Sequence, residues 1–175
     1  FLYPLIYIMK NWYAIYTFAR SEKRVYSRLV DRGIECYIPI QNCTRQWCDR
    51  KKKVDMVVIP SYLFVHMENT EQNFRDIKYI PGVADILRFG LAPYIIPDKI
   101  IDDINKMLQA SEQPCNLVYD YIPGDKVRVI GGKLRGLTGD VIEVSGQYHL
   151  RVSLDKLGTL ETVVPKSCVQ IVELS

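Results

Sequence analysis

The sequence predicts an α+β protein, in which an N-terminal antiparallel sheet flanked by helices is followed by a small C-terminal β-barrel. Strand-like and helix-like stretches alternate over residues 10–108, a polar stretch without periodicity follows, and short strands separated by glycines come after Pro123-Gly124-Asp125. Closely spaced short strands are typical of small barrels. The sequence therefore divides into an N-terminal extension (1–9), a mixed α/β domain (10–108), a linker (109–121) and a barrel domain (122–175).

The first domain is expected to begin with a strand. Asn11–Thr17 is filled with aromatic and β-branched residues and contains no strand-breaking residue. Ser21 can cap a helix that Gly33 ends, and its apolar positions recur at helical spacing at Val25, Leu29 and Val30. A second strand is predicted over Ile34–Ile40.

A polar, basic stretch then separates this strand from two more. Residues 41–53 contain Arg45 and the run Arg50–Lys53, which is typical of a solvated loop or hairpin tip, although such charge can also steer a protein toward nucleic acid. Strand character resumes at Val54–Ile59 and again, after Pro60-Ser61, at Tyr62–Met67. In that last strand a period of two places Tyr62, Phe64 and His66 on one face and Leu63, Val65 and Met67 on the other.

The rest of the first domain is predicted to form a helix, a strand and a second helix. A helix capped by Asn69 or Thr70 is expected to bury Phe74 and Ile77 and to end before Pro81-Gly82. A strand follows over Val83–Phe89. Pro97-Asp98 then opens a helix with one apolar stripe, made of Ile100, Ile101, Ile104, Met107 and Leu108. The predicted barrel strands are Lys126–Ile130, Asp140–Val144, Tyr148–Leu154 and Thr162–Val164.

Composition and charge exclude several classes of protein. The net charge is only +3, and residues 1–110 are basic whereas residues 111–175 are slightly acidic, so long stretches of nucleic acid are not neutralised by this chain alone. The five cysteines lack zinc-ligand spacing, and the two histidines stand far apart, which predicts free thiols, no metal and no cofactor. The apolar start, FLYPLIYIM, is too short to span a membrane. Met9 resembles a translation start, so residues 1–8 are interpreted as an upstream extension. The protein is expected to be cytoplasmic.

No catalytic constellation is present in the sequence. It has no nucleophile elbow, and Gly131-Gly132-Lys133 lacks the upstream glycine and the following Ser/Thr of a phosphate loop. A Cys-dependent enzyme remains a remote alternative. Binding is the favoured function, because the strand Tyr62–Met67 is apolar on both faces and therefore needs a second packing partner, either the helices or another protein. The alternative is that Tyr62 and Phe64 are simply core residues.

Several segments together resemble a known family. WYAIYT, SEKRVYSRLVDRGIECYIP and PSYLFVHM followed by IPGVADILRFG are similar to the N-terminal (NGN) domain of NusG-type transcription elongation factors, and PGDKVRVIGGKLRGLTGDVIEV resembles their KOW motif. The resemblance covers about Lys10 to Glu173. It implies a ferredoxin-like or RRM-like NGN domain and an SH3-like KOW barrel, without catalytic activity.

The resemblance also implies a mode of action. NusG-type factors dock on the clamp helices of RNA polymerase, suppress pausing, and recruit a further partner, such as a ribosomal protein, through the barrel. By this match the polymerase-binding residues are Tyr16, Tyr62, Phe64 and Phe89, with Ile59 and Ile101 at the rim. The helix facing non-template DNA or nascent RNA carries Arg20, Lys23, Arg24 and Arg28, for which a solvated helix face is the alternative.

Two departures from the family pattern indicate a specialised paralogue. Asn73-Phe74-Arg75 replaces the His-Thr-Thr segment of the antiterminator RfaH, and Leu157-Gly158-Thr159-Leu160 replaces a Phe-Gly-Arg-x-Thr-Pro segment that housekeeping members use with Rho or a ribosomal protein. The pattern resembles RfaH-like and UpxY-like antitermination factors, the latter associated with capsular polysaccharide operons. The rival interpretation is a stand-alone RNA-binding or ribosome-associated KOW protein.

Overall fold

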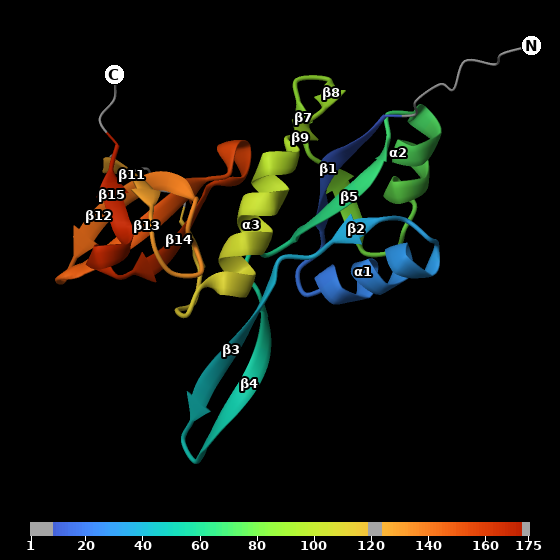
Figure 1. Cartoon of the computed structure of the whole chain (residues 1–175). Helices are drawn as coiled ribbons and strands as arrows, with labels where there is room; N and C mark the ends of the chain where they lie inside the picture. Colours follow the sequence, from blue (N-terminus) through green and yellow to red (C-terminus); the bar gives the residue numbers. More distant parts are fainter. Residues whose placement is uncertain (1–8, 119–123, 173–175) are drawn as a thin grey trace, which may run out of the picture. The chain divides into compact units, whose positions relative to one another are not determined.

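The computed structural model describes residues 9–118 and 124–172, which form two compact units. The first unit contains the described residues as far as Ile38 together with Ile59–Asp98, and the second contains Pro39–Val58 and the described residues from Lys99 onward. The proposed extension of residues 1–8 and the Pro123 that opens the predicted barrel lie outside the described residues. Each unit is built on antiparallel strands, so the α+β class predicted from the sequence is confirmed (Figure 1).

The first unit is organised around one antiparallel sheet. Its strands lie in the order β2-β5-β1-β6, and a fifth strand, β9, also pairs with β1. A separate two-stranded ribbon is formed by β7 and β8, so the single strand predicted over Val83–Phe89 is in fact two short strands. The bounds are β1 Lys10–Thr17, β2 Cys36–Tyr37, β5 Tyr62–Glu68, β6 Val83–Ile86, β7 Arg88–Phe89, β8 Ala92–Pro93 and β9 Ile95–Ile96.

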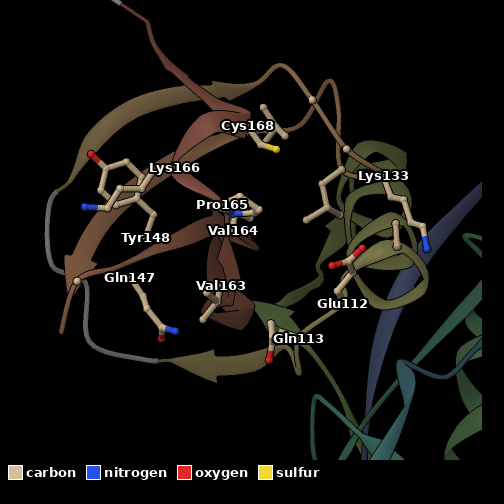
Figure 2. Close-up of a pocket in the computed structure, with 16 residues that line it drawn as sticks. Glu112, Gln113, Lys133, Gln147, Tyr148, Val163, Val164, Pro165, Lys166 and Cys168 are labelled. Carbon is tan, nitrogen blue, oxygen red and sulfur yellow. The ribbon is translucent and has the colours of Figure 1, made fainter.

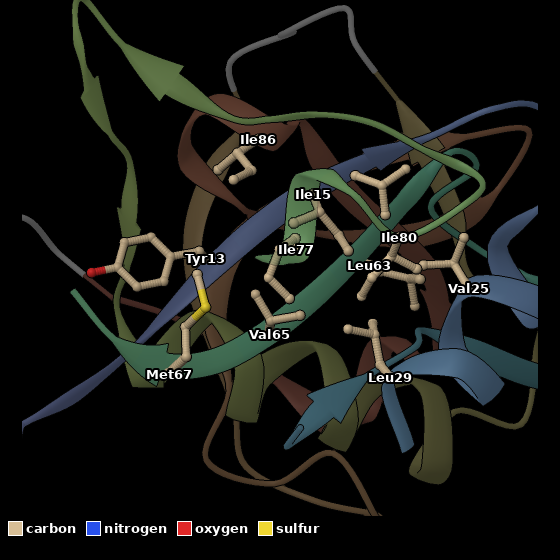
Figure 3. Close-up of a cluster of buried hydrophobic side chains, with 11 residues drawn as sticks. Tyr13, Ile15, Val25, Leu29, Leu63, Val65, Met67, Ile77, Ile80 and Ile86 are labelled. Atoms are coloured by element: carbon tan, nitrogen blue, oxygen red, sulfur yellow. The ribbon is translucent and has the colours of Figure 1, made fainter. Parts of the chain in front are cut away.

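Two helices bury one face of this sheet. The helices are α1 (Glu22–Asp31) and α2 (Glu71–Lys78), and Thr70 caps the second by accepting a hydrogen bond from the Asn73 backbone N–H at 3.2 Å. The core between sheet and helices, shown in Figure 3, contains Tyr13, Ile15, Val25, Leu29, Leu63, Val65, Met67, Ile77, Ile80, Val83 and Ile86. Of the three apolar positions noted at helical spacing in the sequence, Val25 and Leu29 are buried, whereas the Val30 side chain is 51% exposed.

The second unit begins with a long β-hairpin. Its strands are β3 (Ile40–Trp47) and β4 (Arg50–Val57), and they pair only with each other. The sequence predicts a strand over Ile34–Ile40 and a loop or hairpin tip over residues 41–53. The structure instead shortens that strand to β2 and extends pairing almost to the tip, because the two polar strands satisfy each other's backbone hydrogen-bonding groups.

The remainder of the second unit is helix α3 (Asp98–Ala110) from Lys99 onward and a six-stranded antiparallel sheet. The sheet order is β10-β14-β13-β12-β11-β15, and its buried side chains are mostly aliphatic, with Asp140 and Thr162 as buried polar residues. Within the segment that the sequence assigns to a linker, Cys115 is buried and β10 pairs with β14. The bounds are β10 Asn116–Val118, β11 Asp125–Val129, β12 Thr138–Val144, β13 Gln147–Ser153, β14 Thr159–Val164 and β15 Val169–Ile171.

Two glycines permit close approach of the barrel strands. A Cβ added to Gly139 would overlap the backbone carbonyl oxygen of Arg151, and one added to Gly124 would overlap that of Val141. Backbone atoms of a paired strand cannot rotate away as a side chain can. Glycine is therefore required at both places, which explains their positions in the PGD and TGD segments of the sequence.

Candidate functional site

The face of the first sheet opposite α1 and α2 is covered with aromatic side chains. Directly paired residues share a face of a sheet, and β1 pairs with β5 through Trp12↔His66, Ala14↔Phe64 and Tyr16↔Tyr62. Tyr37 on β2 pairs with Phe64 and joins them. We call this surface the aromatic face; its residues are Trp12, Ala14, Tyr16, Tyr37, Tyr62, Phe64 and His66.

The rings of the aromatic face contact one another in pairs. The ring centroids of Tyr16 and Tyr62 are 4.6 Å apart, and those of Tyr37 and Phe64 are 6.1 Å apart. Burial raises the pKa of the Tyr37 hydroxyl from its ordinary value of 10.0 to about 12. These contacts fix the rings in place, so a partner docking here would lose little side-chain entropy on binding.

At the end of the aromatic face, His66 lies between a ring and a carboxylate. Its imidazole stacks on Trp12 with centroids 4.7 Å apart, and its Nδ1 lies 2.8 Å from Oε2 of Glu35. The His66 backbone N–H also donates to the Glu35 carbonyl at 2.9 Å. This side of the face is therefore polar at its edge and apolar toward Tyr62.

The structure separates the six predicted polymerase contacts into two groups. Tyr16 and Tyr62 are half-buried, and Phe89 is 66% exposed on β7. Phe64 and Ile59 have no exposed surface, and Ile101, on α3, is 7% exposed. The area available to a partner thus comes from Tyr16, Tyr62 and Phe89, whereas Phe64 is buried against Tyr37.

Sequence reasoning missed Trp12 and Tyr37 on this face. The signal for Trp12 was present, since a period of two from Tyr16 through Ala14 leads to it. Tyr37 could not be found in the same way, because its place depends on the pairing of β2 with β5, far along the chain.

The predicted nucleic-acid-binding residues lie on and just before α1. Arg20, Lys23 and Arg24 are exposed, whereas Arg28 is half-buried and donates a hydrogen bond from Nη1 to the carbonyl of Pro81. A buried carboxylate, Glu22, ties the helix to the start of β5 by accepting the Ser61 backbone N–H at 2.8 Å. Of the three exposed basic side chains, Lys23 and Arg24 therefore extend from a helix that is held firmly on the sheet, and Arg20 lies just before that helix.

The two segments that depart from the family pattern contribute to packing. Phe74 lies edge-on to Tyr13 with centroids 5.0 Å apart, and Asn73 donates from its amide to the Glu68 carbonyl at 3.1 Å. In the barrel, Leu157 and Leu160 are 2% and 0% exposed. The leucines that replace the housekeeping segment are thus part of the barrel core.

The barrel also has a cavity of about 520 Å³ at one side. Its lining includes the apolar side chains of Val129, Leu134, Val163 and Val164, and Figure 2 shows Tyr148, Lys166 and Lys133 around it. Lys166 lies 4.6 Å from the Tyr148 ring centroid and 2.8 Å from a carboxylate oxygen of Glu143. The cavity is therefore apolar inside with a charged rim.

Neither a metal centre nor a membrane-spanning helix is found in the described residues. Within residues 9–118 and 124–172 no group of three or more His, Cys, Asp or Glu side chains is placed to hold a metal ion. No helix in that same part of the chain is long and apolar enough to cross a membrane.

Comparison with known proteins defines the class. A family model described as "Transcription termination factor nusG" matches residues 10–105, and one described as "KOW motif" matches residues 123–155. The chain therefore belongs to the NusG family, whose members are transcription termination/antitermination factors and not enzymes.

Individual relatives agree with this assignment. The chain is 26% identical over 160 residues to "Transcription termination/antitermination protein NusG" of Rickettsia felis, covering 86% of this chain and 83% of the relative. It is 26% identical over 162 residues to the protein of the same name from Pasteurella multocida, covering 85% and 87%. A solved structure of Thermotoga maritima NusG shares the fold, with a TM-score of 0.61, 20% identity, and coverage of 94% of this chain and 98% of that one.

Proposed function

We propose that this chain is an operon-specific factor that binds RNA polymerase through the aromatic face and suppresses pausing or termination. The observation that carries the proposal is the aromatic face itself: a rigid group of rings on the side of the sheet that the two helices leave uncovered. Its occupant would be the clamp helices of the polymerase, and the protein would act in the cytoplasm.

The proposed mechanism uses binding energy and no chemistry. An amphipathic helix laid on an apolar surface gains affinity from a few aromatic anchors, each worth roughly 2 kcal/mol or more. Tyr16 and Tyr62 are the anchors, and Phe89 extends the contact from β7. Phe64 packs against Tyr37 and has no exposed surface, so it would contact a partner only after a local rearrangement.

Targeting to particular operons would come from nucleic acid and from the barrel. The exposed Arg20, Lys23 and Arg24 side chains are suited to phosphates of non-template DNA or nascent RNA, while Arg28 is engaged by Pro81. The barrel cavity offers an apolar site for a further protein, such as a ribosomal protein. The buried Leu157 and Leu160 in place of the housekeeping segment support a specialised role, of the capsular or surface polysaccharide type.

The proposal is tested by a run-off assay on a paused polymerase, with and without the full chain. Tyr62→Ala should lower polymerase co-purification at least tenfold and abolish the effect on pausing. Tyr79→Ala is the matched control, because it removes the same side chain from a site that is 78% exposed and off the aromatic face. Unchanged pausing with the wild-type protein, on leader sequences from the candidate operons, would contradict the proposal.

The same variants test the rival function. The paired rings of the aromatic face also suit stacking of RNA bases, as in a stand-alone RNA-binding or ribosome-associated protein. If Tyr62→Ala abolishes RNA binding while polymerase co-purification stays intact, the rival function is the correct one.

A further inference from the structure

The hairpin β3–β4 carries a concentration of positive charge that the aromatic face does not use. Ile40–Val57 contains five basic and two acidic residues, a net charge of +3 that equals the charge of the whole chain. Four of the basic residues are consecutive and exposed at the start of β4. These four residues are Arg50, Lys51, Lys52 and Lys53. Within residues 9–118 and 124–172 they form no ion pair.

The hairpin presents this charge on both of its faces. β3 and β4 pair in unbroken register from Ile40↔Val57 to Trp47↔Arg50. Because successive side chains of a strand point to opposite faces, Lys51 and Lys53 lie on one face and Arg50 and Lys52 on the other. Eight residues per strand give a ribbon about 25 Å long. A single basic face would suit a flat anionic surface, whereas charge on both faces suits a groove with phosphates on either side.

The base of the hairpin is fixed inside its own unit. The Gln41 side chain is buried, accepts the Cys115 backbone N–H at 2.7 Å and donates to the Gln113 carbonyl at 3.3 Å. The Val58 backbone N–H donates to the Pro39 carbonyl at 2.9 Å. The ribbon is therefore anchored at one end, and the charged end is the one that a partner can reach.

From these observations we propose that the hairpin β3–β4 is a binding site for duplex DNA, which it contacts by entering the major groove. A two-stranded ribbon fits the major groove of B-form DNA, which is roughly 12 Å wide. The major groove of A-form RNA is deep and too narrow for side chains to enter, so DNA is the occupant. The residues of this site are other than the basic residues of α1 and the residues proposed to bind polymerase, and DNA binding can be measured on isolated DNA.

The test measures binding of the full chain to a fluorescein-labelled DNA duplex by anisotropy, at salt concentrations between about 50 and 200 mM. Affinity falls as salt rises, so the slope of log affinity against log salt is negative. Each lost phosphate contact reduces the size of this slope by about 0.9. The slope measured for the variant R50A/K51A/K52A/K53A should therefore be smaller in size by up to about 3.6. Between about 50 and 200 mM salt, the loss of affinity of this variant should be roughly 10²-fold smaller than that of the wild-type protein. Lys51→Ala and Lys52→Ala, one from each face, should each reduce the size of the slope by about 0.9.

The control variant removes the same amount of charge elsewhere. It is R75A/K78A/R88A/K99A, which replaces four exposed basic residues outside the hairpin. An equal loss of slope in this control would show a general charge effect and overturn the proposal. So would an unchanged slope in the hairpin variant, or equal hairpin-dependent affinity for an RNA duplex of the same sequence. Unaltered thermal melting of the hairpin variant shows that the fold is intact, and R20A/K23A/R24A measures the α1 site independently.

Discussion

Gly139→Ala should destabilise the barrel without affecting the first unit. Gly139 lies on β12, paired with Val127 of β11, and an added Cβ would overlap the Arg151 carbonyl oxygen on β13. The carbonyl belongs to the backbone of a paired strand, so relief requires β12 and β13 to move apart. Such movement disturbs the hydrogen bonds that hold the middle of the sheet.

The size of the effect follows from the cost of overpacking. Forcing one extra carbon into a well-packed site costs about 1–3 kcal/mol. A barrel of this size has only a few kcal/mol of stability, so the loss is a large part of the total. Amides of β12 and β13 that exchange through opening of the barrel should then exchange roughly 5- to 150-fold faster.

Hydrogen exchange followed by mass spectrometry of the full chain measures this directly. Peptides from β1 and β5 serve as the internal reference, and their exchange should not change. Gly131→Ala is the matched control, because the atom nearest to its added Cβ, Sγ of Cys168, lies 3.5 Å away in ordinary contact. Wild-type exchange rates in Gly139→Ala, or an equal acceleration in Gly131→Ala, would refute the reasoning.

Two further predictions concern the titratable side chains of Tyr37 and of the cysteines Cys36 and Cys48. Burial raises the pKa of Tyr37 from 10.0 to about 12, so its contribution to stability is full below pH 10 and is lost as the pH rises toward 12. Tyr37→Phe should remove this part of the alkaline loss, as measured by denaturant midpoints across that range; an identical pH profile would contradict it. Burial, together with the negative charge of Glu35, raises the pKa of the Cys36 thiol to about 11, whereas Cys48 is exposed. Iodoacetamide should therefore label Cys48 well before Cys36 near neutral pH, as measured by peptide mass spectrometry. Labelling of Cys36 before Cys48 would contradict the burial of the Cys36 thiol.

The sequence predicted best those features that depend on near neighbours in the chain. The period of two in Tyr62–Met67 assigned both faces of β5, and the structure confirms that Leu63 and Val65 belong to the core. It left open whether Phe64 is a core residue or a contact for a partner, because alternation identifies the face of a side chain but not what lies over it; the structure leaves Phe64 no exposed surface. The same limit applies to Tyr37, whose place depends on pairing between distant strands.

The hairpin β3–β4 shows why a polar strand is difficult to predict from the sequence. Residues 41–53 have no apolar period, and β3 and β4 form a two-stranded sheet of their own. Among the hairpin side chains that the structure describes, Gln41 is the buried one. Their strand conformation is set by the cross-strand register, Ile40↔Val57 to Trp47↔Arg50, which a single strand's sequence does not contain. The candidate basic surface was visible in the sequence as a run of charge, but its division between two faces required the register.

The arrangement of β5 explains how one strand can serve both stability and binding. Its inward residues, Leu63 and Val65, pack under the helices, and losing such a side chain typically costs roughly 2–5 kcal/mol of stability. Its outward residue Tyr62 contacts Tyr16 and keeps exposed area for a partner. Because the two sets alternate, the core can hold the strand rigid while the outer set changes with the partner. On the aromatic face this leaves Tyr16 and Tyr62 half-buried and available to a partner, whereas Phe64 has no exposed surface and belongs to the packing of the sheet.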